Sequence, residues 1–370
     1  MFKKLTFPNG LRLILAPMAN SPSATVLVLV GTGSKYETKN INGISHFLEH
    51  LFFKGTKKRP TTLEIASELD AVGGAYNAFT SKEYTGYWAK VDAKHLGLAL
   101  DWVADIFLNS KLSAEEIERE KNVISEEINM YLDTPMSHVW HLWEQLLYGN
   151  QPAGWLTLGD KKIIQALTRP QFLAYLKNQY VAKNTIVILA GNLSQVLFPQ
   201  AMVKKYFQKI GTKNFQNKLK VIEKQKNPET LIHFKETDQT HLILGVRGYN
   251  IFHQDKYVLT VLAQILGGYM SSRLWMEIRE RRGLAYYVRA MSEFYTDSGY
   301  LAANAGLDNK QVKEGIKIIL REFKSLKEKK LSEPELKKAK DHIIGSTFLN
   351  LESSEEIAGW LGGQEVVAKK

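Results

Sequence analysis

Three titratable side chains stand close together in one short apolar segment of the chain. His46, Glu49 and His50 lie in GISHFLEHLFFKGT, residues 43–56, which otherwise has the apolar pattern of a buried helix. On a helix, His46 and His50 are four residues apart and therefore lie on one face, one turn apart. Two imidazoles in this arrangement can ligate one metal ion, and Glu49 lies beside the same face, where it can take a proton from a metal-bound water. The segment therefore predicts a metal site with a general base beside it.

A second helix is needed to complete such a site. Catalytic zinc takes three protein ligands and leaves a fourth position for water. Residues 114–133, AEEIEREKNVISEEINMYLD, predict an amphipathic helix that offers acidic candidates. Glu120 and Glu127 are seven residues apart and share one face of that helix. Glu126 points about 100° away from Glu127 and is expected to face solvent.

Each half of this pattern also has a purely structural explanation. The spacing H-x-x-E-H is the inverted form of a zinc peptidase signature, but it arises by chance in roughly one in a hundred chains of this composition. Two histidines in a helix can be core residues with satisfied hydrogen bonds. Taken alone, Glu120 and Glu127 are explained equally well as solvated residues of an amphipathic helix.

The elements that must position these residues alternate between strands and helices. A β-branched run that stops at glycine predicts a buried strand, and an aromatic-rich stretch around Ser81-Lys82-Glu83 predicts two strands joined by a turn. Apolar residues at helical spacing predict the helices. The sequence indicates strands within 24–33, 75–91 and 184–194, and helices within 43–54, 62–74 and 95–109.

The pattern begins again after a polar, aperiodic tract at residues 214–229. Residues 240–250, THLILGVRGYN, resemble ATVLVLVGTGS in the first half, and an apolar helix follows each segment, so we expect an internal duplication. The second copy has no His-Glu-His group in that helix. We expect a zinc-bearing domain at 1–213, a linker at 214–229 and a homologous second domain at 230–370. We expect this second domain to be C-terminally truncated, since a further helix and strand should follow.

Composition excludes several classes of protein. The chain has no cysteine, which removes disulfides, thiol catalysis and thiolate metal sites. It has no apolar run long enough to span a membrane and no signal-like apolar stretch near its start, so we expect a cytoplasmic protein with no membrane partner. The net charge of +11 first suggests nucleic acid. Because the lysines are scattered and no basic and aromatic residues interleave as a motif, we expect no nucleic-acid partner.

A family resemblance decides between the two explanations of the histidine and glutamate pattern. HFLEHLFFKGT, then GGAYNAFTSKEYTGYWAKV, then EIEREKNVISEEI closely resemble the pitrilysin and insulysin family of zinc metallopeptidases, and LTFPNGLRLI at the start fits the same family. The chain looks most like the two-domain branch that includes the mitochondrial processing peptidase. The resemblance implies His46, His50 and Glu127 as ligands of one Zn²⁺ per chain, Glu49 as the base and Glu120 as a catalytic support. Manganese or cobalt could occupy the same ligands in vitro.

The same resemblance suggests residues that hold a peptide substrate. Asn77 and Ala78 match the family's edge strand near the zinc, where an extended peptide can add as a further strand through backbone hydrogen bonds. Alternatively, this is a plain sheet strand with Asn77 in a turn. Arg279 and Tyr286 match an Arg and a Tyr that stabilise the substrate carbonyl, a suitable task for a cation and a phenol. Alternatively, the helix that carries Arg279 is simply a solvated basic helix, and Arg281, Arg282 and Tyr287 compete for the two roles.

These observations together predict an α+β fold with two duplicated α/β domains, each a mostly antiparallel sheet flanked by helices. We expect a zinc-dependent endopeptidase that hydrolyses unfolded peptides inside an enclosed dimer chamber. By the resemblance, it is a homodimer in which the second domain of one chain faces the zinc of the other. The alternative is a non-catalytic structural subunit of the same superfamily, but such subunits typically have a degraded zinc motif, and this one is intact.

Overall fold

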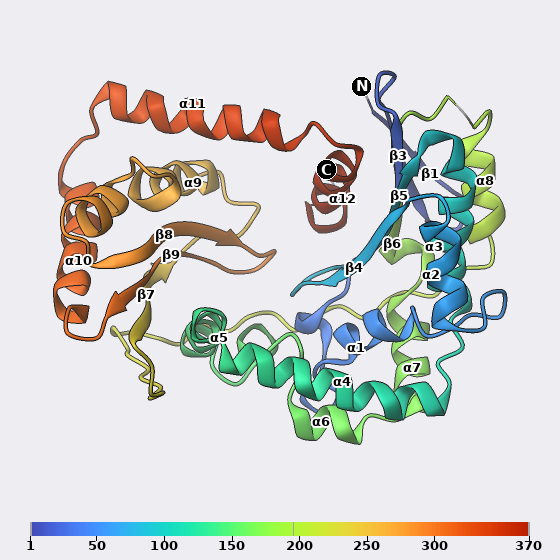
Figure 1. The fold of residues 1–370 in the computed structure, drawn as a ribbon, viewed down its shortest axis with the longest axis horizontal. Coiled ribbons are helices and arrows are strands. Elements are labelled where there is room, and N and C mark those ends of the chain that lie inside the picture. The colour runs from blue at the N-terminus through green and yellow to red at the C-terminus, as the bar shows by residue number, and fades with distance from the viewer. Residues whose placement is uncertain (1, 195, 369–370) are drawn as a thin grey trace. The chain divides into compact units, whose positions relative to one another are not determined.

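The protein is described from a computed structural model, which covers residues 2–194 and 196–368 (Figure 1). The chain forms two compact units. The first comprises the described parts of Met1–Asn129, Trp155–Leu219 and Asn350–Lys370, and the second comprises Met130–Gly154 and Lys220–Leu349. The chain therefore passes between the units at four points, of which the polar tract at 214–229 marks one.

The units differ from the domain ranges expected from the sequence in two segments, and packing explains both. Residues 130–154 belong to the second unit because Trp143 and Leu147 are buried against Tyr300 and Ala302 of its sheet. Residues 350–370 belong to the first unit, since the helix they contain buries apolar side chains on the first sheet. Residues 212–238 contain no helix or strand, as a linker tract would suggest.

The first unit is built on a six-stranded sheet in the order β1-β2-β6-β3-β5-β4. Every neighbouring pair is antiparallel except β2 and β6, which are parallel. β3 and β6 lie in the centre and are buried along almost their whole length, in keeping with their runs of Val, Ile and Leu. The strands are β1 Lys3–Thr6, β2 Arg12–Pro17, β3 Ser23–Val30, β4 Ala75–Thr80, β5 Thr85–Asp92 and β6 Thr185–Gly191.

Helices cover both faces of this sheet. Phe52 of the α1 region stacks on Tyr87 of β5 and also meets Phe107 of α3, which builds an aromatic layer on one face. On the other face, Leu361 and other apolar residues of α12 pack on β2, β3 and β6. The helices of this unit are α1 Ile44–Leu51, α2 Thr62–Asp70, α3 Leu96–Asn109, α4 Ala114–Asp133, α6 Lys161–Ala166, α7 Arg169–Gln179, α8 Pro199–Phe207 and α12 Ser354–Ala368.

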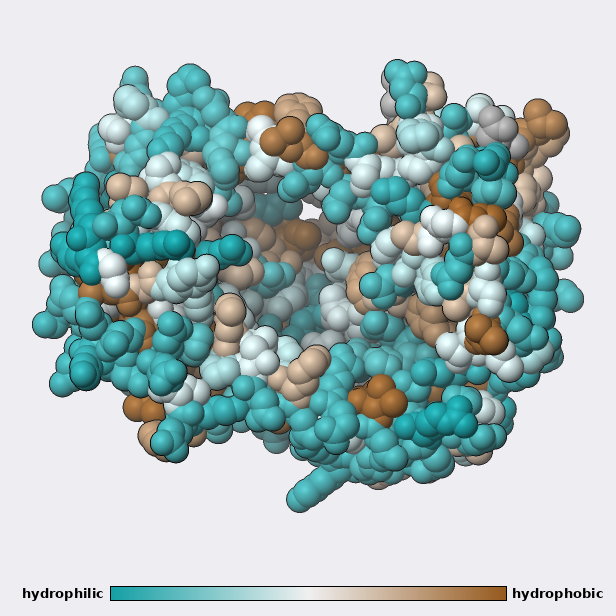
Figure 2. All heavy atoms as spheres, in the orientation of Figure 1, coloured by the Kyte–Doolittle hydropathy of each residue, from teal (hydrophilic) through white to brown (hydrophobic). Residues whose placement is uncertain are grey.

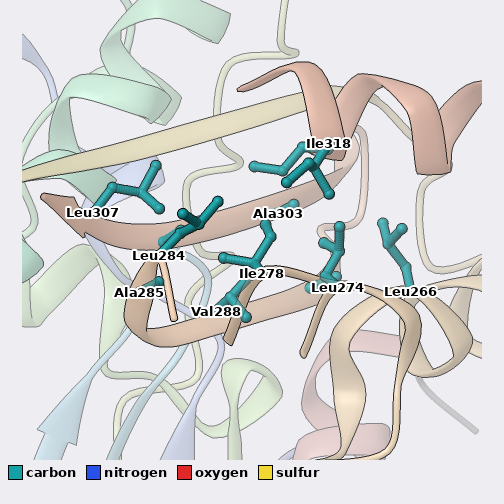
Figure 3. Close-up of a cluster of buried hydrophobic side chains, with 12 residues drawn as sticks. Leu266, Leu274, Ile278, Leu284, Ala285, Val288, Ala303, Leu307 and Ile318 are labelled. Atoms are coloured by element: carbon teal, nitrogen blue, oxygen red, sulfur yellow. The ribbon is translucent and has the colours of Figure 1, made fainter. Parts of the chain in front are cut away.

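The second unit has a three-stranded antiparallel sheet in the order β7-β9-β8. Figure 3 shows its core, in which Val288 and Ala303 from neighbouring strands meet Leu274 and Ile278 from the segment before β8 and Ile318 from α10. Its elements are α5 Pro135–Tyr148, β7 Gln239–Arg247, α9 Lys256–Ala263, β8 Ala285–Phe294, β9 Gly299–Asp308, α10 Val312–Glu328 and α11 Glu333–Asn350, with short π-helical segments at Gln264–Gly268 and Trp275–Glu280.

The α+β class and the mostly antiparallel sheets expected from the sequence are confirmed. Hydrophilic residues cover most of the face seen in Figure 2, and hydrophobic ones appear singly or in small groups. No helix within residues 2–194 and 196–368 is long and apolar enough to cross a membrane.

Candidate metal centre

Helix α1 carries the two histidines and is fixed at its N-terminus by a buried acid. Glu37 accepts hydrogen bonds from the backbone N–H groups of Gly43 at 2.7 Å and Ser45 at 2.9 Å, which would otherwise lack partners at the helix start. Gly43 has a φ of 95°, a left-handed conformation that favours glycine. Burial outweighs these hydrogen bonds and raises the pKa of the Glu37 carboxyl.

Glu127 of α4 meets both histidines of α1. Glu127 Oε1 lies 3.5 Å from His46 Nε2, and Glu127 Oε2 lies 3.3 Å from His50 Nε2. The two imidazole rings stand edge to face with centroids 4.7 Å apart. One ligand atom from each of the three residues lies within 4.8 Å of the others. The three residues that the family resemblance implies as ligands are therefore brought together from two helices.

The charges around this group suit a bound cation. Burial would lower the pKa of His50, but hydrogen bonds and charges from Glu120 and Glu127 overcome it and raise the pKa to about 9. Contacts of the carboxylate with the ring nitrogens of His46 and His50 hold the pKa of Glu127 well below its usual range. Glu127 Oε2 is buried and makes no hydrogen bond of good geometry. Two imidazole nitrogens and a carboxylate oxygen form the donor set of a catalytic zinc ion, so the residues fit this metal.

Glu120 lies behind His50 and contacts the other nitrogen of its ring. Its Oε1 is 3.1 Å from His50 Nδ1, and its Oε2 forms an ion pair with Lys54 Nζ at 2.7 Å. The side chain is only 1% exposed. Burial raises the pKa of Glu120, but the hydrogen bonds from His50 and Lys54 outweigh burial and lower it. Glu120 thus fixes the orientation of the His50 ring, as carboxylates commonly do for metal-binding histidines. Sequence reasoning missed Lys54, although it lies four residues after His50.

Glu49 sits half-buried on α1 and is anchored by a strand residue. Thr80 Oγ1, at the end of β4, donates a hydrogen bond to Glu49 Oε2 at 2.7 Å. Glu126, in contrast, is exposed, as its angle on α4 suggested. No motif or spacing in the sequence points directly to the Thr80 contact. The one available indication is that side chains alternate between the two faces of a strand, which places Thr80 of β4 on the same face as the buried Ala78.

The strand β4 lies at the edge of the first sheet and pairs only with β5 among the described strands. Asn77 and Ala78 both belong to this strand, so Asn77 is not in a turn. Asn77 is exposed, and its Oδ1 accepts a hydrogen bond from the backbone N–H of Ala78 at 2.8 Å. An edge strand of this kind presents backbone groups that can pair with another extended chain.

Arg279 and Tyr286 lie together in the second unit. The Arg279 guanidinium stands 4.4 Å from the centroid of the Trp275 ring and 5.0 Å from that of Tyr286, and it donates a hydrogen bond to the Tyr286 carbonyl. Tyr286 is 76% exposed. The competing residues have other partners: Tyr287 O–H bonds with His241 Nδ1, and Arg281 and Arg282 pair with Glu277.

Comparison with known families shows to which family the chain belongs. Residues 12–161 match the model "Insulinase (Peptidase family M16)", and residues 166–343 match "Peptidase M16 inactive domain". The chain belongs to peptidase family M16, as the resemblance implied.

Among curated relatives, the chain is 38% identical to "Uncharacterized zinc protease YmxG" of Bacillus subtilis, over 100% of this chain and 89% of that protein. It is 34% identical to "Uncharacterized zinc protease ML0855" of Mycobacterium leprae, over 98% of this chain and 82% of that protein. Among solved structures, a protease from Helicobacter pylori is 27% identical with a TM-score of 0.89, over 99% of this chain and 89% of that one.

Proposed function

We propose that this chain is a zinc-dependent endopeptidase that hydrolyses unfolded peptides. The observation that carries the proposal is the convergence of His46, His50 and Glu127, whose two ring nitrogens and carboxylate oxygen match the three protein donors of a catalytic zinc ion, which keeps a fourth position for water. The names of the curated relatives, zinc proteases, support the same metal and reaction class.

The residues around the metal group have distinct tasks. When bound here, zinc supplies Lewis acidity that lowers the pKa of a ligated water and polarises the substrate carbonyl. Glu49 takes the proton from the attacking water and passes it to the leaving amine as the C–N bond breaks. Glu120 holds the ring of His50 and keeps its Nε2 directed at the metal group.

The edge strand β4 suits an unfolded peptide substrate. A peptide that adds to β4 is held through its backbone, so the contact does not depend on its sequence. Asn77 and Ala78 are the strand residues proposed to contact it. An unfolded peptide suits this contact better than a folded protein, because most backbone groups of a folded protein are already paired.

The second unit carries the two residues that we propose to stabilise the substrate carbonyl. Arg279 and Tyr286 would donate hydrogen bonds to the substrate carbonyl as negative charge develops on it. We propose a homodimer in which these residues act at the zinc of the partner chain within an enclosed chamber. One chain carries both the zinc residues and this pair, so two identical copies suffice.

The test measures zinc content and cleavage of a quenched, unstructured peptide, for the wild-type protein and Glu49→Gln. We expect about one zinc per chain, as a single three-ligand site implies, in both proteins and cleavage only in the wild type. Glu115→Gln is the matched control, since Glu115 is 81% exposed on α4 and pairs with Arg119; it should keep both properties.

Other outcomes distinguish the alternative function. A wild-type protein that holds zinc but cleaves nothing favours the alternative function, a non-catalytic structural subunit. A chain of complex III from Candida albicans has the same fold, with a TM-score of 0.78 at 17% identity, which shows the fold alone. Absence of zinc from the wild type would reject the ligand assignment.

A further inference from the structure

The proposed base, Glu49, accepts a hydrogen bond from β4, the strand to which we propose that the peptide binds. Thr80 Oγ1 lies 2.7 Å from Glu49 Oε2, and Thr80 is the last residue of β4. An ionised carboxylate only accepts hydrogen bonds, so the threonine hydroxyl is the donor. A hydrogen bond to a charged acceptor is about twice as strong as one between neutral groups.

We propose that Thr80 is a positioning residue that orients Glu49 for proton transfer and ties it to the peptide-docking strand. This inference rests on the proposed function and adds a residue to it. A glutamate side chain turns about three bonds, so a base without an anchor samples many orientations. The bond from Thr80 engages Oε2, which leaves Oε1 to take the proton.

The turn after Thr80 is held in place by several backbone contacts. The carbonyl oxygens of Ser81 and Lys82 accept hydrogen bonds from the backbone N–H groups of Ser34 and Lys35, at 3.2 and 2.9 Å. At Gly33, a Cβ atom would lie only 2.1 Å from the Ser81 oxygen, so the two backbones touch where only glycine fits. The Thr80 hydroxyl therefore comes from a fixed turn and is preorganised for its contact with Glu49.

A buried ion pair fixes the same turn from its other side. Lys35 Nζ lies 2.8 Å from Glu83 Oε1, and the two side chains are 1% and 5% exposed. Ser81 Oγ further accepts hydrogen bonds from the backbone N–H groups of Glu83 and Tyr84. Because one hairpin holds both the docking edge and the hydroxyl, the register of a bound peptide on β4 sets the distance from its scissile carbonyl to Glu49.

The experiment compares kcat and KM for the quenched peptide in the zinc-loaded full chain. Thr80→Val removes the hydroxyl but keeps the shape and the strand preference of a β-branched side chain. We expect kcat to fall about 10- to 100-fold, as misplacement of a catalytic group by about 1 Å can cause. KM and zinc content should stay within about twofold, because the β4 edge and the ligands are unchanged. Thr80→Ser, which restores a hydroxyl, should recover most of kcat.

Thr85→Val is the matched control. Thr85 lies directly opposite Thr80 in the hairpin, and its hydroxyl donates to the backbone carbonyl of Thr32 at 2.9 Å. The Thr85→Val substitution removes a hydroxyl group from the same hairpin without changing the contact between Thr80 and Glu49. We therefore expect its kcat to stay close to that of the wild type.

Three results would overturn the inference. The first is a Thr80→Val variant with kcat and KM both unchanged. The second is an equal loss of kcat in Thr85→Val. The third is a Thr80→Val variant with a raised KM and an unchanged kcat, which would make Thr80 a peptide-binding residue only. If Thr80→Val does not fold, Thr80→Ser and Thr80→Ala give the same comparison, and equal kcat in these two variants rejects the role of the hydroxyl. A wild-type chain that cleaves nothing rejects the proposed function instead, so the two failures are distinct.

Discussion

Replacing Glu120 by Gln should weaken zinc binding without unfolding the protein. Glu120 is 1% exposed and holds His50 Nδ1 at 3.1 Å. Gln keeps the size of the side chain and one acceptor oxygen but loses the negative charge that strengthens the bond to the imidazole. Its amide N–H₂ group would also face Lys54, which now pairs with the carboxylate at 2.7 Å. The ring of His50 would then be held less firmly.

The size of the effect follows from the contacts. A hydrogen bond to a charged group contributes about 1.5–3 kcal/mol, and about 1.4 kcal/mol corresponds to a factor of ten in an equilibrium constant. The zinc dissociation constant should therefore rise about 10- to 100-fold, the range usual for residues that support a metal ligand. Competition with a chromophoric chelator of known affinity measures this constant directly and does not depend on catalysis.

The matched control is Glu126→Gln, the same chemical change six residues further along the same helix. Glu126 is exposed and contacts Asn129. The zinc dissociation constant of Glu126→Gln should therefore differ from that of the wild type by less than about twofold, as expected for most surface substitutions. Equal affinity of Glu120→Gln and wild type would refute the argument that Glu120 holds His50. An equal loss in both variants would show that net charge, and not contact with the ring, controls affinity.

Two further predictions concern stability. Arg59→Met should lower the free energy of unfolding by about 3–5 kcal/mol, because it leaves the buried carboxylate of Asp105 without its cation, whereas Arg119→Met, on an exposed helix surface, should cost less than about 1 kcal/mol; urea titration measures both, and equal losses would contradict the explanation. Glu37 has a raised pKa in the folded state, so the folded protein holds this proton more tightly than the unfolded chain. The stability of the wild type relative to Glu37→Gln should therefore decline as pH rises above about 4.5 and level off once the folded-state pKa is passed; a difference that grows with pH would contradict the sign. Arg59 is 1% exposed and pairs with Glu68, Asp101 and Asp105, while Arg119 is 59% exposed and pairs with Glu115 and Glu116.

Local spacing explains why the residues of the candidate metal centre could be grouped from the sequence. His46 and His50, and likewise Glu120 and Glu127, are separated by whole helical turns, so each pair shares a face whatever the rest of the fold does. The two glutamates still differ in a way that spacing cannot show. Glu127 faces the Nε2 atoms of both rings, whereas Glu120 lies behind one ring at its Nδ1. The packing of α4 against α1 decides this difference.

Contacts between distant segments were not predictable in the same way. Thr80 reaches Glu49 because a hairpin turn is seated on the backbone at Gly33, a match that no periodic pattern records. The cation–π contacts of Arg279 with Trp275 and Tyr286 likewise depend on rotamers chosen by tertiary packing. Helix α12 was expected in the second domain because sequence order alone placed it there, yet its apolar side chains are buried on the first sheet.

The position of α12 affects how the chain can fold during synthesis. The helix joins the first sheet through Ser354, which bonds Thr25 across 329 residues, and through Glu365, which bonds Lys4 across 361 residues. At about 5–20 residues per second, a ribosome takes roughly 15–70 s to make the chain between these partners. Until then, Leu27, Leu29 and their neighbours lack the helix that buries them. The nascent chain therefore exposes an apolar sheet face for that time, and a chaperone that binds such surfaces would be needed most in this interval.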